Sequence, residues 1–228
     1  VPGGALAFWR ARLTRLGIAA TDVADRFGDA VVACADASGL EFELIANKQD
    51  DRTPWTGPEV DRDAAIRGLH SVTMVVRAEQ PTLDLMTSLL GYRVIDRQDN
   101  RVRVGVGAGG PGRVIDIVVD PAAAPSMNGI GTVHHVAMAI DGADAQLALR
   151  EDLLARGVRV TDVRDRCYFT SIYFREPGGV LFEVATTAPG FDVDEPLDAL
   201  GTALKLPPWE EAHRREIEAG LPEIQLAR

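Results

Sequence analysis

Residues 13–46 repeat in residues 153–186, and the two segments align without a gap at an offset of 140 positions. Identical residues recur across the whole window: Gly17 and Gly157, Thr21-Asp22-Val23 and Thr161-Asp162-Val163, Asp25-Arg26 and Asp165-Arg166, Gly39 and Gly179, and Phe42-Glu43 and Phe182-Glu183. So many identities in one ungapped window mark a true internal repeat. This repeat constrains the fold more than any single motif, because each copy must form the same supersecondary unit.

A weaker repeat relates residues 68–74 to residues 132–138, and both are apolar, β-branched runs typical of a strand. A helical pattern follows each run, over residues 82–90 and 143–156. A glycine closes each pattern, as expected at the C-terminus of a helix. Both copies therefore begin with a strand and a helix.

Three strand-like stretches come after each helix. They cover residues 92–96, 102–105 and 114–119 in the middle copy, and residues 159–163, 171–176 and 180–185 in the last copy. The turn Glu176-Pro177-Gly178-Gly179 has the chemistry of a hairpin. The unit is thus a βαβββ module, and we predict an α+β fold in which tandem modules form curved mixed sheets.

The module boundaries divide the chain into five parts. We assign residues 1–46 to an incomplete βαβββ module that lacks its first strand, 47–67 to a polar linker, 68–120 and 132–187 to two βαβββ modules, and 188–228 to a C-terminal tail with a helix at about 209–219. The 140-residue offset places the first strand of the first module before Val1. We therefore expect that polypeptide is missing upstream, and the absence of an initiator Met agrees; the alternative is that this module never had that strand.

Composition excludes several classes of partner. The formal net charge is −10 and the pI is about 4.9, whereas nucleic acid and anionic membranes require a basic surface. No run approaches the ~20 apolar residues of a membrane span. Two cysteines without a CxxC pattern indicate a reducing, cytoplasmic location. Because a partial module leaves sheet edges bare, we expect a homodimer or higher oligomer, or a missing segment, to cover them.

His135 and Glu183 are the candidate metal ligands. A buried, unpaired carboxylate such as Glu183 in the run VLFEVA is costly, and a metal ion would satisfy it. A His and a carboxylate on neighbouring strands, with one more His, form a 2-His-1-carboxylate face. The alternative is a Glu183 that pairs with Arg166 or lies exposed on a sheet edge.

Three further residues are candidates for proton and oxyanion chemistry. His134 faces away from His135 by strand alternation, unless a twist or bulge intervenes. Arg166 could bind an anionic oxygen or pair with a nearby carboxylate, and Tyr173 could donate a hydrogen bond or merely pack. Glu43 is the repeat partner of Glu183, but the middle module has Ser71 where His135 would stand, so we interpret Glu43 and His70 as relics or surface groups.

The His134-His135-Val136 run, the Arg-x6-Tyr spacing and the Gly-Gly-x-x-Phe-Glu motif resemble the vicinal-oxygen-chelate superfamily of glyoxalases, bleomycin-resistance proteins and extradiol dioxygenases. With the tail FDVDEPLDALGTALKLPPWEEAHRREIEAGLPEI, the chain is most similar to the hydroquinone 1,2-dioxygenase group, over nearly its whole length. This resemblance implies a glyoxalase-like fold and an Fe(II)-dependent, extradiol-type cleavage of hydroquinone-like or catechol-like aromatics by O2, as in aromatic-compound degradation.

The resemblance also implies roles for individual residues. It makes His135 and Glu183 iron ligands and His134, Arg166 and Tyr173 catalytic, while the third ligand, a His upstream of Val1, has no counterpart here. The chain alone is then expected to be inactive. Two other functions stay open: a glyoxalase-type lyase or isomerase with Zn2+ or Ni2+, for which Glu43 is the only residue at a matching position, and a metal-free protein that binds an aromatic ligand.

Overall fold

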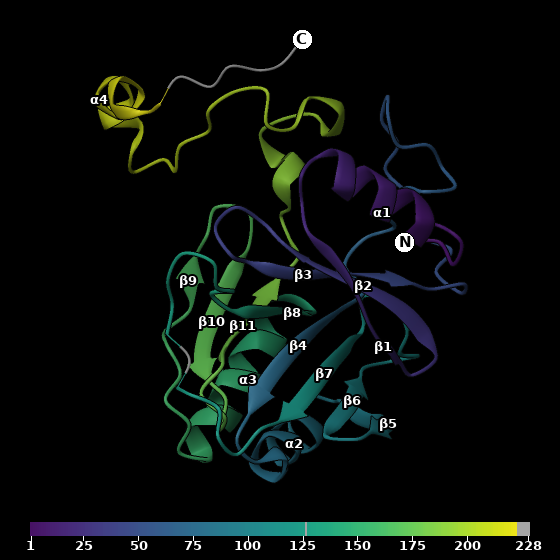
Figure 1. Ribbon diagram of the computed structural model, residues 1–228. Coiled ribbons are helices and arrows are strands. Elements are labelled where there is room, and N and C mark those ends of the chain that lie inside the picture. Colours follow the sequence, from purple (N-terminus) through teal and green to yellow (C-terminus); the bar gives the residue numbers. More distant parts are fainter. Residues whose placement is uncertain (126, 223–228) are drawn as a thin grey trace.

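Three sheets, each flanked by a helix, organise the chain (Figure 1). The computed structural model describes residues 1–125 and 127–222. The first module contains α1 (Leu6–Arg15), β1 (Ala20–Arg26), β2 (Asp29–Ala35) and β3 (Glu41–Ala46). The second contains β4 (Ser71–Val76), α2 (Glu79–Ser88), β5 (Arg93–Gln98), β6 (Arg101–Gly105) and β7 (Val114–Val119). The third contains β8 (Val136–Ile140), α3 (Gly142–Ala155), β9 (Arg164–Asp165), β10 (Thr170–Arg175) and β11 (Leu181–Thr186).

The second and third modules have the same topology. Their strand orders are β4-β7-β6-β5 and β8-β11-β10-β9, and in each sheet the first strand pairs in parallel with the last while the other pairs are antiparallel. The sheets are therefore mixed, and the predicted α+β fold is confirmed. In the first module the order is β1-β2-β3. Among the described residues, a single parallel bridge between Pro2 and Asn47, just after β3, is found where the other modules have a parallel strand.

One predicted strand is largely replaced by side-chain hydrogen bonds. Of residues 159–163, only Val160 bridges β10, at Phe174, and the short β9 begins after them. The reason lies at Thr161, whose carbonyl accepts from Arg150 Nε at 2.8 Å and whose hydroxyl accepts from the Tyr173 backbone N–H at 3.1 Å. Side-chain bonds of this kind compete with a regular ladder, so the edge strand shortens.

One apolar core joins the second and third modules. Met86, Ile117, Leu153, Phe174 and Phe182 are fully buried in it, and α2 and α3 pack against their own sheets. Alternation explains the pattern, because Ile172, Phe174, Phe182 and Val184 face this core while the intervening residues of β10 and β11 face the other way. The intervening face carries the candidate site.

A buried carboxylate fixes the hairpin between β10 and β11. Glu176 Oε2 accepts from Thr82 Oγ1 of α2 at 2.6 Å and from the backbone N–H of Gly178 at 2.8 Å. Its Oε1 accepts from the N–H of Val180 at 2.9 Å. The turn that joins the two strands carrying Tyr173 and Glu183 is therefore tied to the second module.

The first and second modules meet at a buried ion pair. Arg103 Nε and Nη2 donate to the two carboxylate oxygens of Asp116 at 2.7 and 2.9 Å, and the side chains are 9% and 1% exposed. Arg101 Nη1 donates to Asp116 at 3.3 Å. Phe27 of the first module stacks on the Arg103 guanidinium, 4.2 Å from its ring centroid. The Phe27 ring therefore covers the outer side of this pair.

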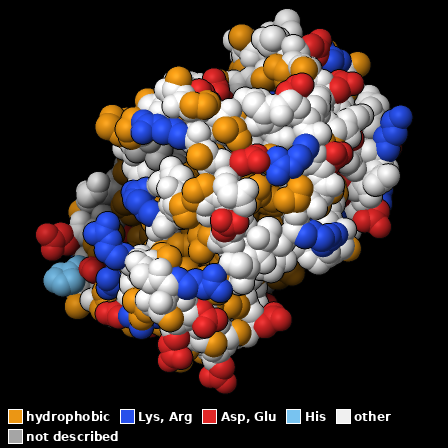
Figure 2. Space-filling view, turned by 90° about the horizontal axis from the view of Figure 1, so that it is seen from below, with side chains coloured by type: hydrophobic (Ala, Val, Ile, Leu, Met, Phe, Trp, Pro, Cys, Tyr) orange, Lys and Arg blue, Asp and Glu red, His pale blue; other side chains and the backbone are white. Residues whose placement is uncertain are grey.

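The tail extends from the third module through three short 3-10 helices, η1 (Phe191–Val193), η2 (Leu197–Ala199) and η3 (Glu211–His213), to α4 (Arg214–Gly220). In Figure 1 α4 stands clear of the sheets. On the face shown in Figure 2, acidic and basic side chains are interspersed and hydrophobic ones gather toward the middle. No helix in the described part of the chain is long and apolar enough to cross a bilayer.

Candidate metal centre

His135 and Glu183 lie together on the open face of the third sheet. His135 immediately precedes β8, and Glu183 is in β11, the parallel neighbour of β8, opposite Ala137. His135 Nε2 is 2.7 Å from Glu183 Oε2. The Glu183 side chain is 5% exposed and the His135 side chain 33% exposed, so the carboxylate sits at the floor of the site and the imidazole at its edge.

Tyr173 and Arg166 form a second layer beside this pair. Tyr173 is the cross-strand partner of Glu183, and its hydroxyl donates to Glu183 Oε1 at 2.7 Å. Arg166 donates to the Tyr173 hydroxyl from Nε at 3.3 Å and from Nη2 at 3.2 Å. Its guanidinium carbon also lies 5.2 Å from the Tyr173 ring centroid, within range of a cation–π interaction. The network therefore orients Glu183 and places a fixed positive charge close to it.

The structure does not show the two alternatives for Glu183, pairing with Arg166 or exposure on a sheet edge, nor the pairing of Arg166 with a carboxylate. Glu183 is buried rather than exposed on an edge, and its partners are Tyr173 and His135. Within the described residues, Arg166 forms no ion pair with Glu183 or Asp165, and its side-chain donors go to the tyrosine hydroxyl.

The prediction that His134 faces away from His135 is wrong. The two residues precede β8, so strand alternation does not apply to them. The rings stand edge to face, and their Nδ1 atoms are 2.8 Å apart, a hydrogen bond in which one nitrogen donates and the other accepts. When a neutral His135 carries its proton on Nε2 and donates to Glu183, its Nδ1 accepts and His134 donates from Nδ1. A metal-ligating Nε2 carries no proton, so His135 would then donate from Nδ1 to His134.

The pair fits two positions of a metal site. Two donors that bind one ion at about 2.1 Å each and at a right angle lie ~3.0 Å apart, close to the observed 2.7 Å. The imidazole and carboxylate are also the donor types of the 2-His-1-carboxylate face. Among residues 1–125 and 127–222, however, no group of three His, Cys, Asp or Glu side chains converges to hold an ion.

The other two modules carry a carboxylate at the same place in their sheets. Glu43 matches Glu183 in the repeat, and Asp116 lies opposite Thr73 as Glu183 lies opposite Ala137. These carboxylates bind guanidinium groups: Glu43 pairs with Arg26, and Asp116 with Arg103 and Arg101. In both modules the cation that binds this carboxylate is thus an arginine of the same module.

Glu43 and His70 are interpreted from the sequence as relics or surface groups, and the structure contradicts the surface location for His70, whose side chain is 12% exposed. Glu43 is partly buried by its ion pair. The His70 side chain is mostly buried, with Nε2 3.8 Å from Asp29 and Nδ1 3.1 Å from the Ser71 hydroxyl. Burial, and then the nearby Arg103, lower the pKa of His70 from its ordinary value.

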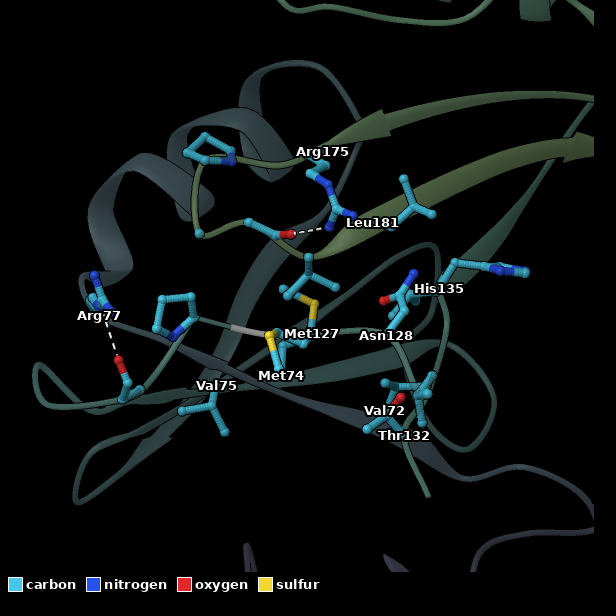
Figure 3. A pocket seen from close by; sticks show the side chains of 18 of the residues that line it. Val72, Met74, Val75, Arg77, Met127, Asn128, Thr132, His135, Arg175 and Leu181 are labelled. Carbon is cyan, nitrogen blue, oxygen red and sulfur yellow. Dashed lines mark hydrogen bonds between the residues drawn. The ribbon is translucent and has the colours of Figure 1, made fainter. Parts of the chain in front are cut away.

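A cavity of about 830 Å3 opens beside His135 (Figure 3). It lies between the edge strands β4 and β8 and reaches β10 and β11 at Arg175 and Leu181. Tyr173 and Glu183 are on the same faces of these strands, behind His135, and are not among the described residues that line the cavity. Most of its lining is apolar, and Arg77 and Arg175 also line it. The sequence contains one signal for Arg175, which is two residues after Tyr173 in the same strand and so shares its face. Nothing in the sequence pattern pointed to Arg77.

Comparison with known proteins agrees with the fold. The model of the "Glyoxalase/Bleomycin resistance protein/Dioxygenase superfamily" matches residues 68–184. The chain belongs to this superfamily. The more similar relatives within it are ring-cleaving dioxygenases. It is 39% identical over 221 residues to "Putative ring-cleaving dioxygenase MhqO" of Bacillus subtilis, covering 97% of this chain and 70% of that protein.

Two further relatives point the same way. The chain is 34% identical over 223 residues to the chlorohydroquinone/hydroquinone 1,2-dioxygenase of Sphingobium indicum, covering 95% of this chain and 68% of that protein. A crystal structure titled as a putative dioxygenase from Bacillus subtilis superposes with a TM-score of 0.91 at 38% identity, covering 99% of this chain and 72% of that one. The chain is thus homologous to ring-cleaving dioxygenases.

Proposed function

We propose that the protein is an Fe(II)-dependent, extradiol-type dioxygenase that cleaves hydroquinone-like or catechol-like aromatics with O2. The observation that carries this proposal is the contact between His135 Nε2 and the buried Glu183 carboxylate, beside a cavity of sufficient size for an aromatic ring. The hydroquinone-cleaving relative supports the choice of substrate class.

In this proposal His135 and Glu183 hold the metal ion, together with a third donor from outside the described residues. Iron bound there would supply Lewis-acid activation of a substrate hydroxyl and a position for O2. Tyr173 holds Glu183 in place through a 2.7 Å hydrogen bond, so the carboxylate keeps one orientation. Removing such a partner usually costs activity without removing a ligand.

Arg166 and His134 supply the charge and the proton path. The Arg166 guanidinium, hydrogen-bonded to the Tyr173 hydroxyl, stabilises negative charge that develops on a substrate oxygen beside it. His134 is hydrogen-bonded to His135 and partly exposed, so it can exchange a proton between the site and solvent. The substrate ring lies against the apolar wall of the cavity.

The glyoxalase-type alternative needs a second carboxylate at the same ion. The matching residue, Glu43, is instead paired with Arg26 in the first module. No observation in the described residues therefore favours that function over ring cleavage.

The test measures O2 uptake and metal content together. Protein that has the third donor, loaded anaerobically with Fe(II), is expected to consume O2 with hydroquinone or catechol, whereas the 228-residue chain alone is expected to be inactive. In the complete site, Glu183→Gln is expected to lower both bound iron and O2 uptake by at least ~100-fold. Glu43→Gln is the matched control, because it removes a carboxylate at the same repeat position while leaving the site intact. Iron binding and O2 uptake that survive in Glu183→Gln would refute the proposal. Tight binding of the aromatic by iron-free protein, without turnover when iron is present, would favour a metal-free binding protein.

A further inference from the structure

The cavity beside His135 is larger than a dihydroxylated ring needs. Its volume of about 830 Å3 lies in the range of pockets for drug-sized ligands, roughly 300–1,000 Å3. Figure 3 shows Arg77 at one end of the cavity and His135 toward the other. A substrate whose ring hydroxyl approaches His135 therefore leaves the remainder of the cavity for a substituent on the ring.

The charge of the lining is opposite to that of the protein. The chain has a formal net charge of −10, yet no Asp or Glu belongs to the described residues that line the cavity. The ionisable groups there are Arg77, Arg175, His134 and His135. A cavity lined by one sign of charge concentrates ligands of the other sign, so this cavity favours an anion.

Both guanidinium groups have donors left for a ligand. Arg77 Nε donates to the Ala123 carbonyl at 2.8 Å, and Arg175 Nη1 donates to the Gly179 carbonyl at 2.7 Å. In the described part of the chain neither arginine forms an ion pair with a carboxylate. Each guanidinium carries five N–H donors, so these single bonds to carbonyls orient the group and leave most donors available.

The wall between the arginines and His135 suits an aromatic ring. Val72 and Val75 of β4, Leu181 of β11, and Met127 and Val133 of the connecting segment present apolar side chains there. Val75, Met127 and Val133 are exposed to solvent, so a ligand that covered them would gain hydrophobic stabilisation. The cavity thus combines an apolar wall with two cations, which matches a ligand that is aromatic and anionic.

We propose that this cavity binds dihydroxyaromatic compounds whose ring carries an anionic substituent, a carboxylate or sulfonate, with the substituent paired to Arg175 or Arg77. The proposal rests on the proposed function for the identity of the ring and deepens it by naming the substituent. Arg175 lies in the strand of Tyr173, so it fixes the anion relative to the catalytic face.

The test compares an acid with its neutral ester on metal-free protein, by isothermal titration calorimetry. The probes are 2,5-dihydroxyphenylacetate and its methyl ester, which share the ring and differ in charge. Wild-type protein is expected to bind the acid about tenfold more tightly, the equivalent of ~1.4 kcal/mol. Arg175→Gln and Arg77→Gln are each expected to reduce that ratio, and the double variant to abolish it. Arg159→Gln, which removes an exposed arginine outside the cavity, is expected to keep it.

The outcomes separate this proposal from the proposed function. Equal binding of acid and ester by wild type, no binding of either, or a preference that survives in the double variant would overturn the anion site, even if hydroquinone is cleaved. Selective binding of the acid that the arginine variants abolish would support it, even if O2 uptake is never observed. If Arg159→Gln also loses the preference for the acid over the ester, that preference comes from the overall charge of the protein, and the proposed anion site in the cavity is refuted.

Discussion

Replacing Asp116 by alanine is expected to destabilise the protein severely, although Asp116 lies outside the candidate site. The change would leave Arg103, which is 9% exposed, without its two hydrogen bonds to a carboxylate, and would also remove the partner of Arg101. Breaking one partner of a buried pair in this way costs roughly 3–5 kcal/mol, because the remaining charge stays buried and unpaired. That is a large part of the ~5–15 kcal/mol by which a typical protein is stable.

A double variant separates the cost of the orphaned charge from the value of the pair. Arg103→Met with Asp116→Leu removes both charges and keeps apolar volume, so it is expected to lie within about 1–2 kcal/mol of wild type, far above Asp116→Ala. Glu79→Ala is the control, because it breaks the exposed pair with Arg97 and is expected to cost less than about 1 kcal/mol.

The assay is urea unfolding followed by circular dichroism, with the midpoint and slope fitted for each variant. A loss of stability in Asp116→Ala no larger than in Glu79→Ala would refute the reasoning. If the double variant is as unstable as Asp116→Ala, the ion pair itself stabilises the contact between the first two modules. The cost of Asp116→Ala would then not come from leaving Arg103 buried without a partner.

Two further predictions concern a hydrogen bond and a histidine. Tyr173→Phe removes the hydroxyl that orients Glu183, so O2 uptake or iron affinity is expected to fall by about 10–100-fold. The amount of iron bound at saturating metal is expected to stay the same. Unchanged O2 uptake and iron affinity would rule out the positioning role of Tyr173. Burial and then Arg103 lower the pKa of His70 below 6.5, more than Asp29 and Asp116 raise it. The unfolded chain therefore takes up this proton first, and stability is expected to fall as the pH drops below about 6.5, by at most ~1.4 kcal/mol per pH unit. His70→Asn is expected to flatten urea midpoints measured from pH 7.5 to 5.5, and an unchanged profile would contradict this.

Much of the architecture follows from the repeat, because copies of one unit must share a strand order and a register. The offset of 140 residues places Glu43 and Glu183 at equivalent points, and the register of the third sheet places Tyr173 opposite Glu183. Alternation then predicts which residues of β10 and β11 face the core. These are local rules, and a sequence expresses them directly.

What the sequence could not predict depends on contacts between segments. His134 meets His135 because both precede β8, and the exact start of a strand is the least certain part of a sequence-based prediction. The strand expected at residues 159–163 is disrupted by Arg150, which comes from α3. The cavity has a wall from β4, in another module, so no pattern within residues 132–187 could reveal it.

The equivalent carboxylates of the three modules show that one position in the sheet can have two different roles. In the second module the strand opposite Asp116 offers Arg103, a cation tethered to the chain that cannot leave. In the third module the strand opposite Glu183 offers Tyr173, which is neutral, and the carboxylate stays available for the proposed exchangeable cation. The residue at this one cross-strand position thus distinguishes the two modules. Arg103 makes the carboxylate of the second module part of a structural ion pair, whereas Tyr173 leaves the carboxylate of the third module without a cation from the chain at that position.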